Sequence, residues 1–169
     1  MIKAAHVFST TVAVTSTREP KRMLRICTEL KPTALQLHYY TPKLIQLIRK
    51  HDASTKLILA TPIRDGLSLR NAKSYSHYSD AILTDTPSEM GIGGTGQTND
   101  WRLAAKVRDS ISPHPLIMAG GLTPKNVEAA IRKVRPFAVD VSSGVERSPG
   151  IKDHRKIREF IMNAKEAAN

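Results

Sequence analysis

The first candidate for chemistry is an acidic residue at the end of a short apolar run. Asp85 lies near the end of the run from Ala81 to Thr86, whose apolar and β-branched residues predict a buried strand. Alternation along a strand places Ala81, Leu83 and Asp85 on one face. Burial at a strand end raises the pKa of a carboxyl toward neutrality, which suits a general acid or base. A role as a helix cap or loop-stabilising aspartate would explain the same residue equally well.

Two glycine-containing loops near the end of the chain predict an anion site. Gly120-Gly121 follows the strand-like run Leu116 to Ala119, and Ser142-Ser143-Gly144 follows the next such run, Ala138 to Val141. Backbone N–H groups in such loops, aided by the dipole of a following helix, bind phosphate without a basic side chain. Tight turns alone would explain either loop, but they explain less readily why adjacent units both carry one.

Weaker candidates come from a strand with alternating polar residues and from a glycine-rich loop. In the run Ala34 to His38, alternation places Gln36 and His38 on the face opposite Leu35 and Leu37, toward a barrel interior. A histidine at a strand end is more often structural than catalytic. The loop Gly91 to Thr98, which includes Gly94 and Gly96, follows Asp85 but lacks the residues of a P-loop and the spacing of a dinucleotide fingerprint.

The single cysteine, Cys27, is predicted to be a core residue. Its spacing with Met23, Leu24 and Leu30 places it on the apolar face of a helix rather than at a strand end. A buried cysteine of this kind acts as a small apolar residue.

Strand-like and helix-like runs alternate six times along the chain. We predict strands at 7–16, 34–38, 56–60, 81–86, 116–119 and 138–141, and helices at 20–30, 41–50, 67–78, 99–110, 123–134 and 153–168. Alternation of this kind implies parallel strands joined by right-handed crossovers, so the fold class is α/β. No linker divides the chain, and we expect one domain over residues 1–169. Six units suit either an open sheet or part of a closed barrel.

The composition indicates which kinds of molecule this chain is expected to bind. Subtracting 15 acidic from 26 basic residues gives a net charge of +11, which attracts anions such as phosphorylated metabolites. The basic residues are scattered and only 5% of the residues are aromatic, so no specific nucleic-acid surface is expected. The dispersed histidines indicate no metal site, and no apolar run reaches the length of a membrane span. One cysteine is typical of a cytoplasmic protein.

Several motifs together resemble one family. They are Ile82 to Thr86, the loop GGTGQT that leads to Asp100-Trp101, AGGLTPKNV from Ala119 and FAVDVSSGVERSPGIKDHRKI from Phe137. In this order and spacing they resemble phosphoribosylanthranilate isomerases of tryptophan biosynthesis, and Gln36-Leu37-His38 is similar to that family's fourth-strand motif. The resemblance implies a (βα)8 TIM barrel. It also implies a cofactor-free Amadori rearrangement of N-(5'-phosphoribosyl)anthranilate to 1-(2-carboxyphenylamino)-1-deoxyribulose 5-phosphate.

The resemblance also assigns roles to residues. Asp85 would be the general acid that protonates the furanose ring oxygen. Substrate and phosphate would be held by residues drawn from the strand ends and the glycine loops, namely Gly120, Gly121, Ser142, Ser143, Gly144, Gln36, His38, Gly94 and Gly96. Asp140 and Ser142 would point into the barrel on the same face. No metal or cofactor is implied.

The sequence departs from the family at its beginning. It contains neither the first-strand Lys-Ile-Cys-Gly type of motif, whose cysteine is the family's base, nor the family's arginine for the anthranilate carboxylate. We therefore expect an incomplete barrel of about six βα units, lacking the family's first two. A reading frame that begins too late, further upstream residues, or loss of the base in a diverged chain would each explain this. Two open sheet edges would favour self-association or completion by an N-terminal segment.

Three functions follow from these observations. The leading hypothesis is the isomerase. The alternative is a catalytically impaired phosphosugar-binding or assembly subunit that retains the phosphate loops and lacks the base cysteine. Nucleic-acid binding driven by the net charge ranks third.

Overall fold

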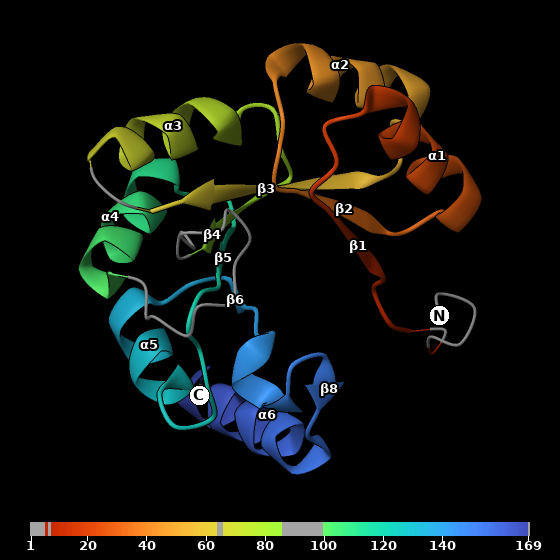
Figure 1. Cartoon of the computed structure of the whole chain (residues 1–169). Helices are drawn as coiled ribbons and strands as arrows, with labels where there is room; N and C mark the ends of the chain where they lie inside the picture. Colours follow the sequence, from red (N-terminus) through yellow and green to blue (C-terminus); the bar gives the residue numbers. More distant parts are fainter. Residues whose placement is uncertain (1–5, 7, 64–65, 86–99, 169) are drawn as a thin grey trace.

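The computed structural model describes residues 6, 8–63, 66–85 and 100–168, and its centre is a sheet of six parallel strands. The strands are paired in chain order: β1 (Val12–Thr15), β2 (Ala34–Leu37), β3 (Lys56–Pro62), β4 (Ala81–Asp85), β5 (Leu116–Met118) and β6 (Ala138–Val139). The helices are α1 (Pro20–Leu30), α2 (Pro42–His51), α3 (Gly66–Ser76), α4 (Trp101–Ile111), α5 (Val127–Val134) and α6 (His154–Ala168). They form an outer layer around a curved sheet (Figure 1). The α/β class and the incomplete barrel of six units are confirmed.

The convex face of the sheet, beneath the helices, carries the larger core. Leu35 and Leu37 on β2 and Leu57 and Leu59 on β3 are fully buried there. They pack in one cluster with helix residues that include Met23, Cys27, Ile45, Ile48, Val107 and Val134. The concave face carries a separate, smaller cluster of Ala34, Ile58, Ala60, Ala81, Leu83 and Ala119. The predicted alternation along β2 and β4 is therefore confirmed.

Local signals explain where several helices begin. The Thr41 hydroxyl accepts a hydrogen bond from the amide of Leu44 at 3.2 Å, and Pro42 occupies the first turn of α2. Asp100 caps α4 by accepting hydrogen bonds from the amides of Arg102 and Leu103.

Two boundaries differ most from the prediction. Strand β1 spans only Val12–Thr15, the length over which it pairs with β2. Helix α5 begins at Val127 rather than Thr123, because the Asn126 side chain folds the preceding residues into a turn. On α6, Phe160 is buried, whereas the neighbouring Ile161 is 47% exposed.

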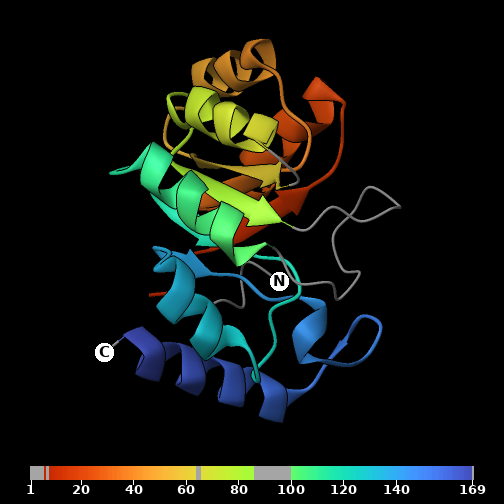
Figure 2. The same ribbon diagram turned by 90° about the vertical axis from the view of Figure 1, so that its left-hand side faces the viewer.

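The segment between β6 and α6 holds structure that the sequence did not predict. A short 3₁₀ turn (η2, Ser143–Val145) leads into a small antiparallel hairpin of β7 (Glu146–Ser148) and β8 (Ile151–Lys152). Gly150 turns this hairpin with a φ of +78°, a conformation that favours glycine. Figure 2 shows the hairpin on the side toward which the parallel strands point. Within the described ranges, the helices include none with the length and apolarity that a membrane crossing requires.

Candidate functional site

The carboxyl ends of the strands surround a cavity of about 450 Å³. In parallel α/β folds this edge of the sheet is where ligands bind. The cavity brings together most of the residues selected from the sequence: Gln36, His38, Asp85, Gly120, Gly121, Ser142, Ser143 and Gly144. The remaining two, Gly94 and Gly96, lie outside the described residues. Val14, Leu83, Asp140 and Lys152 also contribute to the lining.

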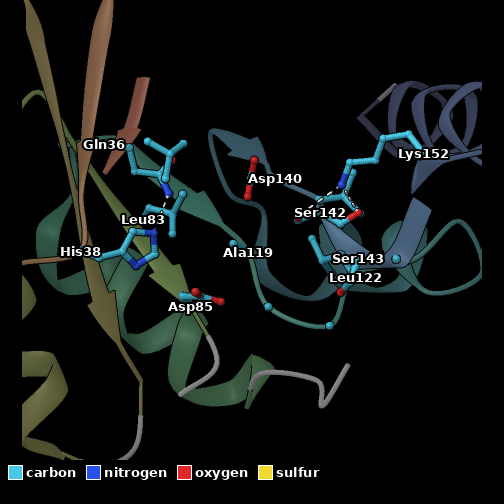
Figure 3. A pocket seen from close by; sticks show the side chains of 15 residues that line it. Gln36, His38, Leu83, Asp85, Ala119, Leu122, Asp140, Ser142, Ser143 and Lys152 are labelled. Atoms are coloured by element: carbon cyan, nitrogen blue, oxygen red, sulfur yellow. Dashed lines mark hydrogen bonds between the residues drawn. The ribbon is translucent and has the colours of Figure 1, made fainter. Parts of the chain in front are cut away.

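One wall of the cavity carries the groups that can exchange protons. Asp85 ends β4, with Leu83 on the same concave face. His38 extends β2 by one residue, since its amide donates to the carbonyl of Thr15 at 3.1 Å. The ring Nε2 of His38 lies 3.4 Å from Nε2 of Gln36, which is itself buried. In Figure 3 the side chains of Gln36, His38 and Asp85 lie on the same side of the pocket.

A second carboxyl, Asp140, lies between this wall and the loops opposite (Figure 3). Its amide donates to the carbonyl of Met118 at 2.8 Å, which places it directly after β6. The protein atoms around it and, second, the negative charge of Asp85 raise the pKa of the Asp140 carboxyl, while Lys152 and His38 act in the opposite direction. The residue remains open to solvent on the cavity side. Asp140 therefore holds a proton to higher pH than an ordinary aspartate.

The opposite wall is built from loops rather than strands. Gly120 and Gly121 adopt φ values of +88° and +66°, in the left-handed region that favours glycine. The Asn126 side chain holds this turn, because its Nδ2 donates to the Gly121 carbonyl at 3.0 Å and its Oδ1 accepts from the Thr123 amide at 2.8 Å. The glycine loop was predicted to run directly into a helix N-terminus. The structure corrects this prediction, since the turn of residues 123–126 intervenes before α5.

Gly144 is required by packing between the two loops. A Cβ atom at this position would lie 1.8 Å from the carbonyl oxygen of Leu122, far inside van der Waals contact. Any larger residue would push the loop after β6 away from the loop after β5. The close approach of two loops, rather than a tight turn within one, explains this glycine.

Lys152 is a charged pocket residue to which the sequence pattern assigned no role. Its Nζ donates to the carbonyl of Ser142 at 2.9 Å and to Oε1 of Glu146 at 2.8 Å, and it lies 3.3 Å from the Ser142 hydroxyl (Figure 3). The only signal in the sequence was its place in the motif GIKDH, immediately before Asp153, whose carboxylate caps α6.

Cys27 is not part of the pocket. It is 1% exposed and packs in the helix-covered core, and burial raises the pKa of its thiol. A buried, protonated thiol is a poor base and nucleophile. The prediction that it is a core residue is confirmed. The described part of the chain also contains no group of three or more His, Cys, Asp or Glu side chains placed to hold a metal ion.

Comparison with known proteins identifies the family. The family model of N-(5'phosphoribosyl)anthranilate (PRA) isomerase matches residues 2–163. The chain belongs to this isomerase family. An N-(5'-phosphoribosyl)anthranilate isomerase of Haloferax volcanii is 39% identical over 168 residues, which are 99% of this chain and 73% of that protein.

Solved structures of phosphoribosyl anthranilate isomerases have the same fold. The enzyme from Thermotoga maritima superimposes with a TM-score of 0.81 at 39% identity, covering 98% of this chain and 77% of that one. A structure in complex with reduced 1-(o-carboxyphenylamino)-1-deoxyribulose 5-phosphate gives a TM-score of 0.79 at 37% identity, with coverages of 98% and 76%.

These comparisons confirm the resemblance seen in the motifs, and with it the isomerase function in tryptophan biosynthesis. The match is not limited to the C-terminal half, where the motifs were most specific, but extends over nearly the whole chain. The alternative of a binding or assembly subunit is not favoured. This chain spans about three quarters of the length of the isomerases that it matches.

Proposed function

We propose that the described pocket carries out the Amadori rearrangement of N-(5'-phosphoribosyl)anthranilate, with Asp85 as the general acid. The observation that supports this assignment most is that a carboxyl group and the backbone of two glycine-containing loops lie on opposite walls of one cavity. The carboxyl of Asp85 ends a strand on one side, and the backbone of the two glycine loops faces it across the cavity (Figure 3). This separation suits a substrate with a reacting sugar ring at one end and a phosphate at the other.

The loop wall binds the phosphate in this proposal. The backbone N–H groups of Gly121, Ser143 and Gly144 lie in turns of the kind that bind phosphate without cationic side chains. Ser142 and Ser143 add hydroxyl groups to this wall. Gln36 and His38 contact the sugar from the opposite side of the cavity, at the end of β2.

The reaction then proceeds in two proton transfers. Asp85 gives its proton to the furanose ring oxygen while the bond between this oxygen and C1 breaks, and the anilino nitrogen lone pair forms a protonated Schiff base. A base next takes the proton from C2, and the resulting enolamine tautomerises to the 1-amino-1-deoxyketose. Cys27 is not that base, because it is buried in the helix-covered core. His38 and Asp140 also line the described pocket and can exchange protons.

The partner and location follow from the same proposal. The ligand is a phosphorylated small molecule, and the reaction takes place in the cytoplasm.

In the described structure β1 and β6 are not paired with each other, and Val14 on β1 is 61% exposed on the cavity side. Association with a second copy or with a completing polypeptide segment would cover this edge. A monomeric mass in light scattering would contradict association with a second copy.

The test is turnover of phosphoribosylanthranilate by the purified chain, followed as the change in anthranilate fluorescence. Asp85→Asn should lower kcat by about 10²- to 10⁴-fold, the usual contribution of general acid catalysis. Its affinity for ribose 5-phosphate should stay within about twofold, since no phosphate-binding group changes. Asp109→Asn is the matched control, because this carboxylate is 68% exposed on α4 and pairs with Arg108. Equal turnover in Asp85→Asn and wild type would remove Asp85 from the mechanism.

A further inference from the structure

The hairpin between β6 and α6 fastens the loop proposed to bind phosphate. The Ser142 carbonyl accepts two hydrogen bonds, one from Lys152 Nζ at 2.9 Å and one from the Val145 amide at 3.4 Å, which closes the 3₁₀ turn. The Val145 carbonyl in turn accepts from the Asp153 amide at 2.8 Å. Both ends of the turn are therefore bonded to consecutive residues, Lys152 and Asp153, at the end of β8.

Lys152 has little capacity left for a ligand. An ammonium group has three N–H donors. Two of them bond the Ser142 carbonyl and Glu146 Oε1, and the third points to the Ser142 hydroxyl at 3.3 Å. The Glu146 side chain is only 17% exposed, and the Glu146 carbonyl accepts from Lys156 Nζ at 2.6 Å. Lys152 is thus anchored by the carboxylate of Glu146, a residue whose backbone carbonyl is bonded to the start of α6.

We propose that Lys152 is a positioning residue for the substrate phosphate. It holds the Ser142 carbonyl so that the turn of residues 143–145 keeps its backbone directed at the cavity, and it does so without contacting the phosphate. This inference rests on the proposed function, because the anion that the loop receives is the phosphate of that substrate. The packing of Gly144 against the Leu122 carbonyl transmits the same constraint to the neighbouring glycine loop.

The test compares Lys152→Met and Lys152→Arg with Lys165→Met as a control. Lys165 lies on the exposed face of α6, outside the pocket, and its loss removes the same charge. Two measurements are made on each protein: the Kd for ribose 5-phosphate, and the hydrogen-exchange rate of the Val145 amide.

Lys152→Met should raise both quantities about tenfold, the effect of losing one hydrogen bond to a charged group. Lys152→Arg should restore most of the affinity, and Lys165→Met should leave both quantities within twofold of wild type. The thermal midpoint should change little, since the Lys152 side chain is 41% exposed and a single ion pair at the surface contributes little to stability.

Each other outcome counts against the proposal. Weaker binding with unchanged exchange at Val145 would make Lys152 a direct ligand. Equal weakening in Lys152→Met and Lys165→Met would reduce the effect to net charge. Faster exchange without any change in affinity would leave Lys152 a purely structural residue. If wild type does not bind ribose 5-phosphate, the proposal that these loops bind phosphate is wrong. Lys152 then fails as a phosphate-positioning residue, whereas turnover of the substrate by wild type would still preserve the isomerase assignment.

Discussion

The two faces of the parallel sheet are built from different residues. The convex face is covered by helices and filled with large side chains, such as Leu59 and Ile82, that are fully buried. The concave face is lined mostly by alanines, with only Ile58 and Leu83 as large members of its buried cluster. Two members of this cluster, Leu83 and Ala119, also line the 450 Å³ cavity. The convex face therefore supplies most of the buried apolar surface that stabilises the fold. The concave face buries fewer and smaller side chains and borders the ligand cavity.

Neighbouring residues of β3 allow this comparison to be tested directly. Leu59 points to the convex face and is 0% exposed, whereas Ile58 points to the concave face and is 9% exposed. Substitution of either by alanine removes the same number of carbon atoms. We expect Leu59→Ala to lower the free energy of unfolding by about 4 kcal/mol, and Ile58→Ala by about 2 kcal/mol, because Ile58 packs in the smaller cluster and is already partly accessible to solvent.

Urea denaturation of both variants measures the difference. A cost for Ile58→Ala equal to that of Leu59→Ala would mean that the concave cluster stabilises the fold as much as the helix-covered core, and that the comparison between the faces is wrong.

The next largest effect concerns the contact between the two loops of the cavity. Gly144→Ala forces a Cβ atom against the Leu122 carbonyl, where it would lie at 1.8 Å unless the backbone moves. Overpacking of this kind costs about 1–3 kcal/mol of folding free energy, and the shift should also abolish binding of ribose 5-phosphate.

Gly66→Ala is the matched control for this substitution. It makes the same chemical change in α3, where an added Cβ meets no atom within 4 Å and alanine favours the helix. We expect its stability and its binding to equal or exceed those of wild type. Phosphate affinity that survives Gly144→Ala would separate the loop contact from ligand binding.

The sequence predicted one wall of the site, which the ends of β2 and β4 form, better than the opposite wall, which the loops after β5 and β6 form. We call these the strand wall and the loop wall. Alternation placed Gln36 and Asp85 on the concave side, and the succession of strand-like and helix-like runs located the six helices of the described chain, although the run that became α3 is less regular than the others. These signals work because one buried face imposes a period of two on a strand and 3.6 on a helix. The same signal separated Leu35 from Gln36 on β2, although both are buried.

The loop wall depends on contacts that carry no periodic signal. The Lys152–Ser142 bond joins residues ten positions apart through a hairpin of mostly exposed side chains. The approach of Gly144 to Leu122 joins two different loops, and the Asn126 side chain ends the helix pattern expected from Thr123. Each of these contacts exists only after the strands have brought the loops together, so composition and spacing within one segment could not indicate them.

The smallest effect is expected on the convex face, at the lone cysteine. Cys27 lies in the helix-covered core, so Cys27→Ala should leave turnover within twofold and cost about 1 kcal/mol of stability. Burial raises the pKa of the thiol, so the folded state keeps it protonated while the unfolded chain ionises near pH 8.5. The stabilising contribution of the thiol is therefore complete below that pH and declines as the pH rises toward the folded-state value.

Measuring unfolding free energies of wild type and Cys27→Ala from pH 7 to 10 isolates this contribution, because every other titrating group is common to the two proteins. The stability advantage of wild type should shrink as the pH rises. An advantage that grows instead would mean that the folded state favours the thiolate. Loss of turnover in Cys27→Ala would place chemistry on the convex face and so contradict the division of roles between the two faces.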